Sequence, residues 1–184
     1  MRLYKIIFLA ICLGLLPAIL TGRAQAPTPS EKQVKVAFLY NFAKFIDWPP
    51  EAFTNEKSPF VIGIVGDNPF GPLLEQMMTG RSINERPIAV QTFQAGDDAF
   101  TNCHILFISG SEKKRFAEIV HKLHGAAALT VCDTDGFLGA GGMVNFVMVD
   151  GKIRFQISDS NARAARLKIS AKLLSLAIHP NTSS

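Results

Sequence analysis

Uninterrupted apolar runs constrain the fold of this chain more than any other feature. Residues 60–65, 103–108 and 127–132 are short stretches rich in β-branched and aromatic side chains, with almost no polar residues. Strands with one solvated face alternate polar and apolar residues, whereas strands covered on both faces read as continuous apolar runs. The three runs therefore predict inner strands of a mainly parallel sheet that helices cover on both sides.

Segments with helical spacing alternate with these runs. Apolar residues recur three and four positions apart in residues 31–46, which follow Ser30 and end at Trp48-Pro49-Pro50. Two shorter helices are predicted over residues 72–78 and 112–123. A last helix is predicted after a Ser158 N-cap, with these residues on one face: Ala162, Ala165, Ile169, Leu173 and Leu176.

The remaining segments complete an α/β pattern. Residues 87–93 are a further predicted strand, and Asp150-Gly151 is a strong turn signal for a hairpin of residues 143–149 and 152–157. We expect one domain over residues 31–178, with a three-layer α/β/α Rossmann-like architecture. Its sheet should be mostly parallel, with an antiparallel hairpin at one edge.

The first 26 residues have the composition of an export signal. A basic start precedes an apolar run over residues 6–20, which is shorter than the roughly 18–20 residues that a membrane-spanning helix needs. Ala24-Gln25-Ala26 then matches the A-x-A pattern of a signal-peptidase site. We predict cleavage after Ala26 and a periplasmic mature chain, with a short leader over residues 27–30 and a flexible tail over residues 179–184. The alternative is an uncleaved N-terminal membrane anchor.

The net charge of the chain depends on this signal. The full sequence has 19 Lys and Arg against 15 Asp and Glu, a formal net charge of +4. Cleavage removes Arg2, Lys5 and Arg23 and no acid, so 16 basic residues remain against 15 acidic ones and the net charge falls to about +1. Nucleic acid is therefore not an expected partner, because phosphate contacts need a surplus of clustered Lys and Arg.

Two cysteines remain in the mature chain. Cys103 begins one predicted strand and Cys132 ends the next. In neighbouring parallel strands their sulfurs would lie at opposite ends, beyond the roughly 4.4–6.8 Å between Cα atoms that a disulfide allows. We expect two unpaired thiols or a bridge between chains.

Motifs that indicate catalysis or a cofactor are weak. The glycines of residues 63–71 lack the G-x-G-x-x-G spacing of a dinucleotide site. His121 and His124 have no third metal ligand nearby, and Cys103 and His104 point to opposite faces of a strand. We expect neither an enzyme nor a bound metal or cofactor.

The turn after the first apolar run is one candidate site. It consists of Gly66, Asp67, Asn68, Phe70 and Gly71. A tight turn is the simplest interpretation. A small-ligand pocket is the alternative, because open α/β sheets bind ligands at the carboxyl ends of their strands.

Aromatic residues of the first helix and its end form a second candidate set. Tyr40, Phe42 and Trp48 either anchor this helix to the core or form a partner-binding face. A third set, Arg163, Arg166 and Lys168, is the main basic cluster left after processing. It is either a solvated helix face or an electrostatic contact for an acidic partner.

Several motifs together resemble the YfiR family of periplasmic regulators. They are VAFLYNFAKFIDWP over residues 36–49, the stretch over residues 63–71, NCHILFIS over residues 102–109, LTVCD over residues 129–133, GGMVNF over residues 141–146, and residues 152–174. The motifs occur in the expected order and the resemblance extends over residues 31–178. The first and last motifs are the most specific.

The resemblance implies a non-enzymatic, dimeric inhibitor of an inner-membrane diguanylate cyclase, acting on the periplasmic part of that cyclase. It further implies an outer-membrane lipoprotein of the YfiB type that sequesters the inhibitor, which raises cyclic-di-GMP and biofilm formation. A sensor kinase is an alternative partner, and a small-ligand receptor is an alternative function. Disulfides of the family do not carry over, because partners for Cys103 and Cys132 are absent.

Overall fold

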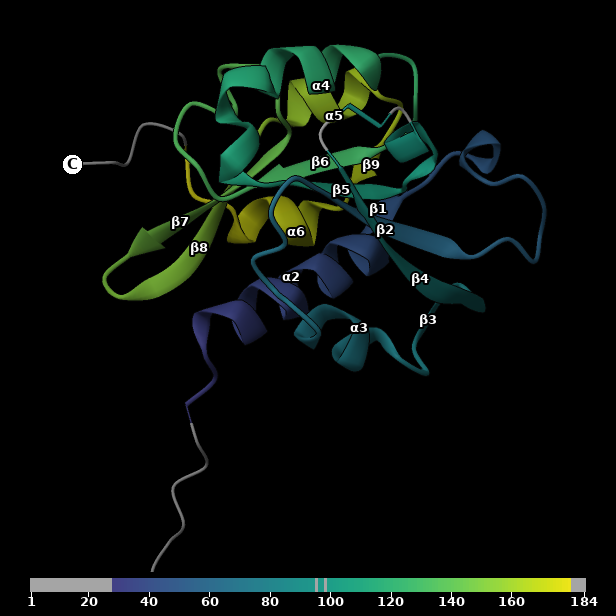
Figure 1. The fold of residues 1–184 in the computed structure, drawn as a ribbon, viewed down its shortest axis with the longest axis horizontal. Helices are drawn as coiled ribbons and strands as arrows, with labels where there is room; N and C mark the ends of the chain where they lie inside the picture. Colours follow the sequence, from purple (N-terminus) through teal and green to yellow (C-terminus); the bar gives the residue numbers. More distant parts are fainter. Residues whose placement is uncertain (1–27, 95, 98, 180–184) are drawn as a thin grey trace, which may run out of the picture.

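A seven-stranded sheet in the order β3-β4-β2-β5-β6-β7-β8 forms the centre of the molecule (Figure 1). The computed structural model describes residues 28–94, 96–97 and 99–179. The predicted export signal, its cleavage point and most of the predicted tail lie outside these residues. The strands of the sheet are β2 (Phe60–Val65), β3 (Ser82–Ile83), β4 (Arg86–Phe93), β5 (Ile105–Ile108), β6 (Leu129–Cys132), β7 (Val144–Val149) and β8 (Lys152–Ile157).

The inner strands are parallel, as their apolar composition predicts. β2 pairs in parallel with β4 and β5, β5 pairs with β6, and β6 pairs with β7. Every side chain of β5 and β6 is buried. The predicted hairpin is confirmed: β8 runs antiparallel to β7, and Asp150 and Gly151 both adopt positive φ, at 50° and 68°, as a two-residue hairpin turn requires. β3, which the sequence pattern did not predict, adds an antiparallel strand at the opposite edge.

Helices cover both faces of the sheet. In Figure 1, α2 (Glu31–Phe45), α3 (Leu73–Met78) and α6 (Ala171–Leu176) lie on one side, with α4 (Phe116–Lys122) and α5 (Asp159–Ala164) on the other. A capping box begins α2: Gln33 N–H donates to Ser30 Oγ at 3.3 Å, and Ser30 N–H donates to Gln33 Oε1 at 2.8 Å. The layered α/β architecture predicted from the sequence is therefore correct.

The segment after β8 is not the single helix that its apolar spacing predicts. α5 ends at Ala164, Arg166 adopts a φ of 62°, and Lys168–Ile169 form the short strand β9. β9 pairs antiparallel with β1 (Ile46–Asp47), and α6 follows.

The break has a clear physical cause. Ser170 N–H donates to the Phe45 carbonyl at 3.0 Å. This bond gives a hydrogen-bond partner to the last carbonyl of α2 and to a backbone N–H of the last segment. The turn also buries Leu167 completely. Leu176, predicted to face the core, is 58% exposed instead.

The two cysteines are free and buried. Phe107 of β5 pairs with Val131 of β6, so Cys132 lies level with Ile108. Cys103 precedes Ile108 by five residues, which separates the two cysteines by roughly 16 Å along the strands at the usual rise per residue. The expected absence of a disulfide between them is confirmed. Their burial also disfavours a bridge between chains.

Candidate functional site

The crevice where an open α/β sheet usually binds a ligand is filled by side chains of this protein. The chain leaves β2 toward α3 on one face and leaves β5 toward α4 on the other, which makes the carboxyl ends of these strands the switch point of the sheet. Asp67 N–H donates to Ser111 Oγ at 3.1 Å. A Cβ added to Gly66 would lie 2.5 Å from Ser111 Oγ and 2.8 Å from Glu112 Cγ. The buried Glu112 carboxylate is itself paired with Arg115 at 2.9 Å.

The turn that follows Gly66 is held by its own side chains. Asn68 Oδ1 accepts hydrogen bonds from Phe70 N–H at 2.9 Å and from Gly71 N–H at 3.2 Å. The buried Phe70 ring packs edge-on against Phe107, with 4.8 Å between ring centroids. The contacts of these residues are those of a tight turn closing the strand end.

Aromatic rings surround the buried His104 at the other end of the sheet. Its imidazole is 5% exposed and lies between Phe53 and Phe60, with centroid distances of 4.5 and 4.7 Å. Nδ1 accepts a hydrogen bond from Val61 N–H at 3.0 Å, so the ring is neutral with its proton on Nε2. Burial lowers the pKa of His104 to about 4; Arg86 adds to this effect, and the Ala52 carbonyl opposes it.

Arg86 extends this stack to the loop that precedes β2. Its guanidinium lies 4.0 Å from the Phe53 centroid and donates to the carbonyls of Asn55 and Ser58 at 2.6 and 3.0 Å. These contacts fix the 50–59 loop against the sheet. The same stack of rings holds the His104 side chain in place.

The aromatic candidates of α2 occupy different positions. Phe42 is completely buried and packs on Phe146 and Phe155 at 5.8 and 5.1 Å, so it anchors the helix. Trp48 Nε1–H donates to the Ala43 carbonyl near the end of α2 at 3.2 Å. Only part of Trp48 reaches the surface.

Tyr40 is partly exposed on the α3 side of the helix. Its ring lies 4.8 Å from the Arg81 guanidinium and 5.6 Å from Lys44 Nζ. Two cations beside this ring make Tyr40 the member of the aromatic set that is best placed for a polar partner.

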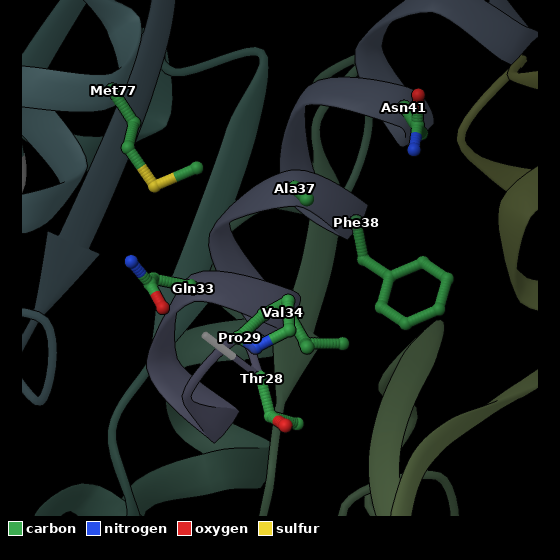
Figure 2. Close-up of a pocket in the computed structure, with 8 residues that line it drawn as sticks. All are labelled: Thr28, Pro29, Gln33, Val34, Ala37, Phe38, Asn41 and Met77. Atoms are coloured by element: carbon green, nitrogen blue, oxygen red, sulfur yellow. The ribbon is translucent and has the colours of Figure 1, made fainter. Parts of the chain in front are cut away.

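An apolar groove runs along the outer face of α2. Figure 2 shows Ala37 facing outward from the helix, with Gln33 and Val34 one turn below and Met77 of α3 across the opening. The groove has a volume of about 520 Å³, and none of its lining residues is charged. The lining residues are Thr28, Pro29, Gln33, Val34, Ala37, Phe38, Asn41 and Met77.

The three predicted basic residues line one hollow, although they do not share a helix. Arg163 lies on α5, Arg166 in the turn after it and Lys168 on β9, around a volume of about 550 Å³. The Arg163 side chain is 74% exposed and pairs with Asp159 at 2.5 Å. Arg166 donates to the Gly125 carbonyl at 2.8 Å, which fixes its backbone turn. Three cations and one carboxylate leave this hollow positively charged.

Within the described ranges, no group of His, Cys, Asp and Glu is arranged to hold a metal ion. None of the helices in that part of the chain is long and apolar enough to cross a membrane. The candidate features are thus an apolar groove and a basic hollow on the outside of a sheet whose switch point is filled.

Helices on both faces of a mostly parallel sheet, with the switch point closed, define a layered α/β domain. The sequence profile of the YfiR/HmsC-like family matches residues 32–178, and the chain belongs to that family. At the level of the family, this is a periplasmic regulator associated with diguanylate cyclases of the YfiN type. No curated protein matches the chain.

Sequence reasoning missed the groove on α2. Its signal is in the sequence: Val34, Ala37, Phe38 and Asn41 follow helical spacing on the face opposite Val36 and Leu39. A helix that is apolar on two opposite faces predicts a second packing surface. The contributions of Met77 and of residues 28–29 depend on tertiary structure and had no local signal.

Proposed function

We propose that this chain inhibits a membrane-bound diguanylate cyclase by binding the periplasmic part of that cyclase. The observation that carries the proposal is the family match over residues 32–178. The inhibitor would bind one conformation of the cyclase more tightly than the other, and this difference in affinity would shift the signalling equilibrium. A sensor kinase is the alternative partner and would be regulated by the same principle.

The basic hollow is the contact surface we assign to the cyclase. Arg163 and Lys168 are exposed, and their positive charge favours an acidic partner surface. The half-buried Ile169 also lines the hollow. Apolar side chains next to charged ones are typical of protein contact sites.

Three finer parts belong to the same proposal. The mature protein is periplasmic after cleavage behind Ala26, it acts as a homodimer, and an outer-membrane lipoprotein of the YfiB type competes with the cyclase for it. Mass spectrometry of the exported protein would test the first part, because cleavage after Ala26 leaves Pro27 as the N-terminal residue. Retention of residues 1–26 would favour the membrane-anchor alternative.

Capture from envelope membranes tests the central proposal. The wild-type protein should recover a diguanylate cyclase, and Arg163→Glu combined with Lys168→Glu should reduce recovery at least tenfold and raise cyclic-di-GMP in cells. Lys113→Glu combined with Lys114→Glu is the matched control, because it reverses two exposed charges before α4. Arg166 is left intact because of its bond to Gly125.

Equal recovery by the wild-type chain and the Arg163/Lys168 variant would refute the assigned surface. Recovery of no membrane signalling protein, together with a metabolite that raises the melting temperature, would favour the receptor alternative.

A further inference from the structure

α2 has uncharged, largely apolar side chains on two opposite faces, as a helix that is covered on both sides does. Its inner face buries Val36, Leu39 and Phe42 against the sheet. Its outer face exposes Ala37 between the partly buried Val34 and Asn41. A surface helix normally presents a polar outer face, so the uncharged groove of Figure 2 departs from the usual pattern.

The spacing of the outer face is self-complementary. If α2 packs antiparallel against an identical helix about an axis between Ala37 and Phe38, Val34 comes level with Asn41 of the second copy. The small Ala37 side chain at the centre allows the two helices to approach closely, within the usual 8–10 Å between helix axes. A twofold contact of this kind repeats every interaction twice.

Charges at the two ends of α2 fit the same arrangement. Glu31 and Lys44 are both exposed, at the first and last turns. Within the described part of the chain Glu31 makes no ion pair, and Lys44 Nζ lies 5.6 Å from the centroid of the Tyr40 ring. The antiparallel axis brings Glu31 level with Lys44 of the second copy at both ends. A parallel pair would instead place Glu31 beside Glu31 and Lys44 beside Lys44.

We propose that the groove on α2 is the homodimer interface, occupied by α2 of a second copy in antiparallel orientation. The inference rests on the dimer included in the proposed function and assigns it a surface separate from the basic hollow. α5 and β9 then remain free in both copies, so each dimer presents two basic hollows to its partners.

Sedimentation velocity of the protein purified from the periplasm tests the interface. The wild-type chain should sediment as a dimer at 10–100 μM (an order-of-magnitude range for a modest interface). Ala37→Arg should raise the dissociation constant by at least about 100-fold, because the symmetry buries two unpaired charges at the axis. Lys114→Glu, an exposed change on another face, should leave the dimer intact.

A charge exchange tests the orientation. Glu31→Lys alone and Lys44→Glu alone should each weaken the dimer roughly fivefold, since each creates two like-charge pairs. The double variant should restore most of the wild-type affinity. A parallel dimer would keep one like-charge pair at each end in the wild type and in all three variants, so equal affinities across the set would overturn the antiparallel assignment.

Cross-linking gives a measurement that does not depend on how Ala37→Arg folds. Ala37→Cys places a thiol beside the axis, and mild oxidation should link two chains through it, whereas Lys114→Cys should not link them. A wild-type monomer at 100 μM, or an unlinked Ala37→Cys dimer, would overturn the interface. Cyclase capture by the Ala37→Arg monomer would leave the proposed function standing, because Ala37 lies outside the basic hollow.

Discussion

The buried His104 predicts a specific loss of stability in acid. The neutral ring fits the folded state, and burial lowers its pKa from 6.5 to about 4. In the unfolded chain the pKa returns to about 6.5. As the pH falls below 6.5, His104 therefore binds a proton in the unfolded chain but not in the folded chain. The free energy of unfolding decreases as a result. The loss is complete once the pH is below about 4.

The magnitude follows from the size of the shift. Each pKa unit corresponds to about 1.4 kcal/mol, so the full loss is about 3 kcal/mol at pH 4, with about 2 kcal/mol already lost at pH 5. His104→Phe removes the titrating group and keeps a ring between Phe53 and Phe60. It leaves Val61 N–H without its acceptor, which costs about 1–3 kcal/mol at pH 7. The variant should be less stable at pH 7 and equal to the wild type near pH 5.

Urea unfolding between pH 7 and pH 4.5 measures this difference. Trp48, the single tryptophan, packs 6.1 Å from His104 and reports unfolding by fluorescence, with far-ultraviolet circular dichroism as a second signal. His124→Gln, a change at an exposed histidine, should keep the wild-type pH dependence. A stability difference between the wild type and His104→Phe that stays constant over this pH range would refute the reasoning.

Two substitutions and one labelling experiment test the packing and the first helix. Gly63→Ala should destabilise the protein by about 1–3 kcal/mol, because its Cβ would collide with Cys103 Sγ; calorimetry should show partial recovery with Cys103→Ala added, and no recovery would contradict the stated contact. Burial raises the pKa of Cys103 to about 12 and of Cys132 to about 11, so both thiols should resist Ellman's reagent at pH 8 until urea unfolds the chain; rapid labelling of the native protein would contradict their burial. Ser30→Ala should lower the free energy of unfolding by about 1 kcal/mol through loss of the cap, measured by urea unfolding, whereas an unchanged midpoint would show that the capping box adds no stability.

The sequence predicted the features that depend on local pattern. Apolar runs identified β2, β5 and β6 because strands buried on both faces need no polar alternation. Asp150-Gly151 identified the hairpin because that dipeptide adopts the two positive φ angles of the turn.

The failures occurred where distant partners decide the structure. Ala162, Ala165, Ile169 and Leu173 fit helical spacing, yet the chain breaks at Arg166 because Ile169 pairs with Ile46. A two-residue strand has no periodicity of its own. The three predicted basic residues still line one hollow, because Arg163, Arg166 and Lys168 are close in sequence whether or not the segment is a single helix.

The aromatic set shows a different limit. Helical spacing placed Phe42 and Tyr40 on α2 correctly but did not distinguish the face that packs on the sheet from the face that remains open. Phe42 lies on the sheet because Phe146 and Phe155 supply its neighbours. That choice depends on strands about a hundred positions later in the chain.

The pairing of β1 with β9 has a consequence for the order in which the protein folds. Ile46 and Ile169 are about 120 positions apart, and Ser170 contributes the N–H bound by the last carbonyl of α2. The first helix therefore lacks its final neighbours until nearly the whole chain has been synthesised. Contacts this distant in sequence slow folding, because a long loop must close before they form. The β1–β9 pairing thus joins the two ends of the described chain, so the native packing of the first helix can be completed only as the last step of folding.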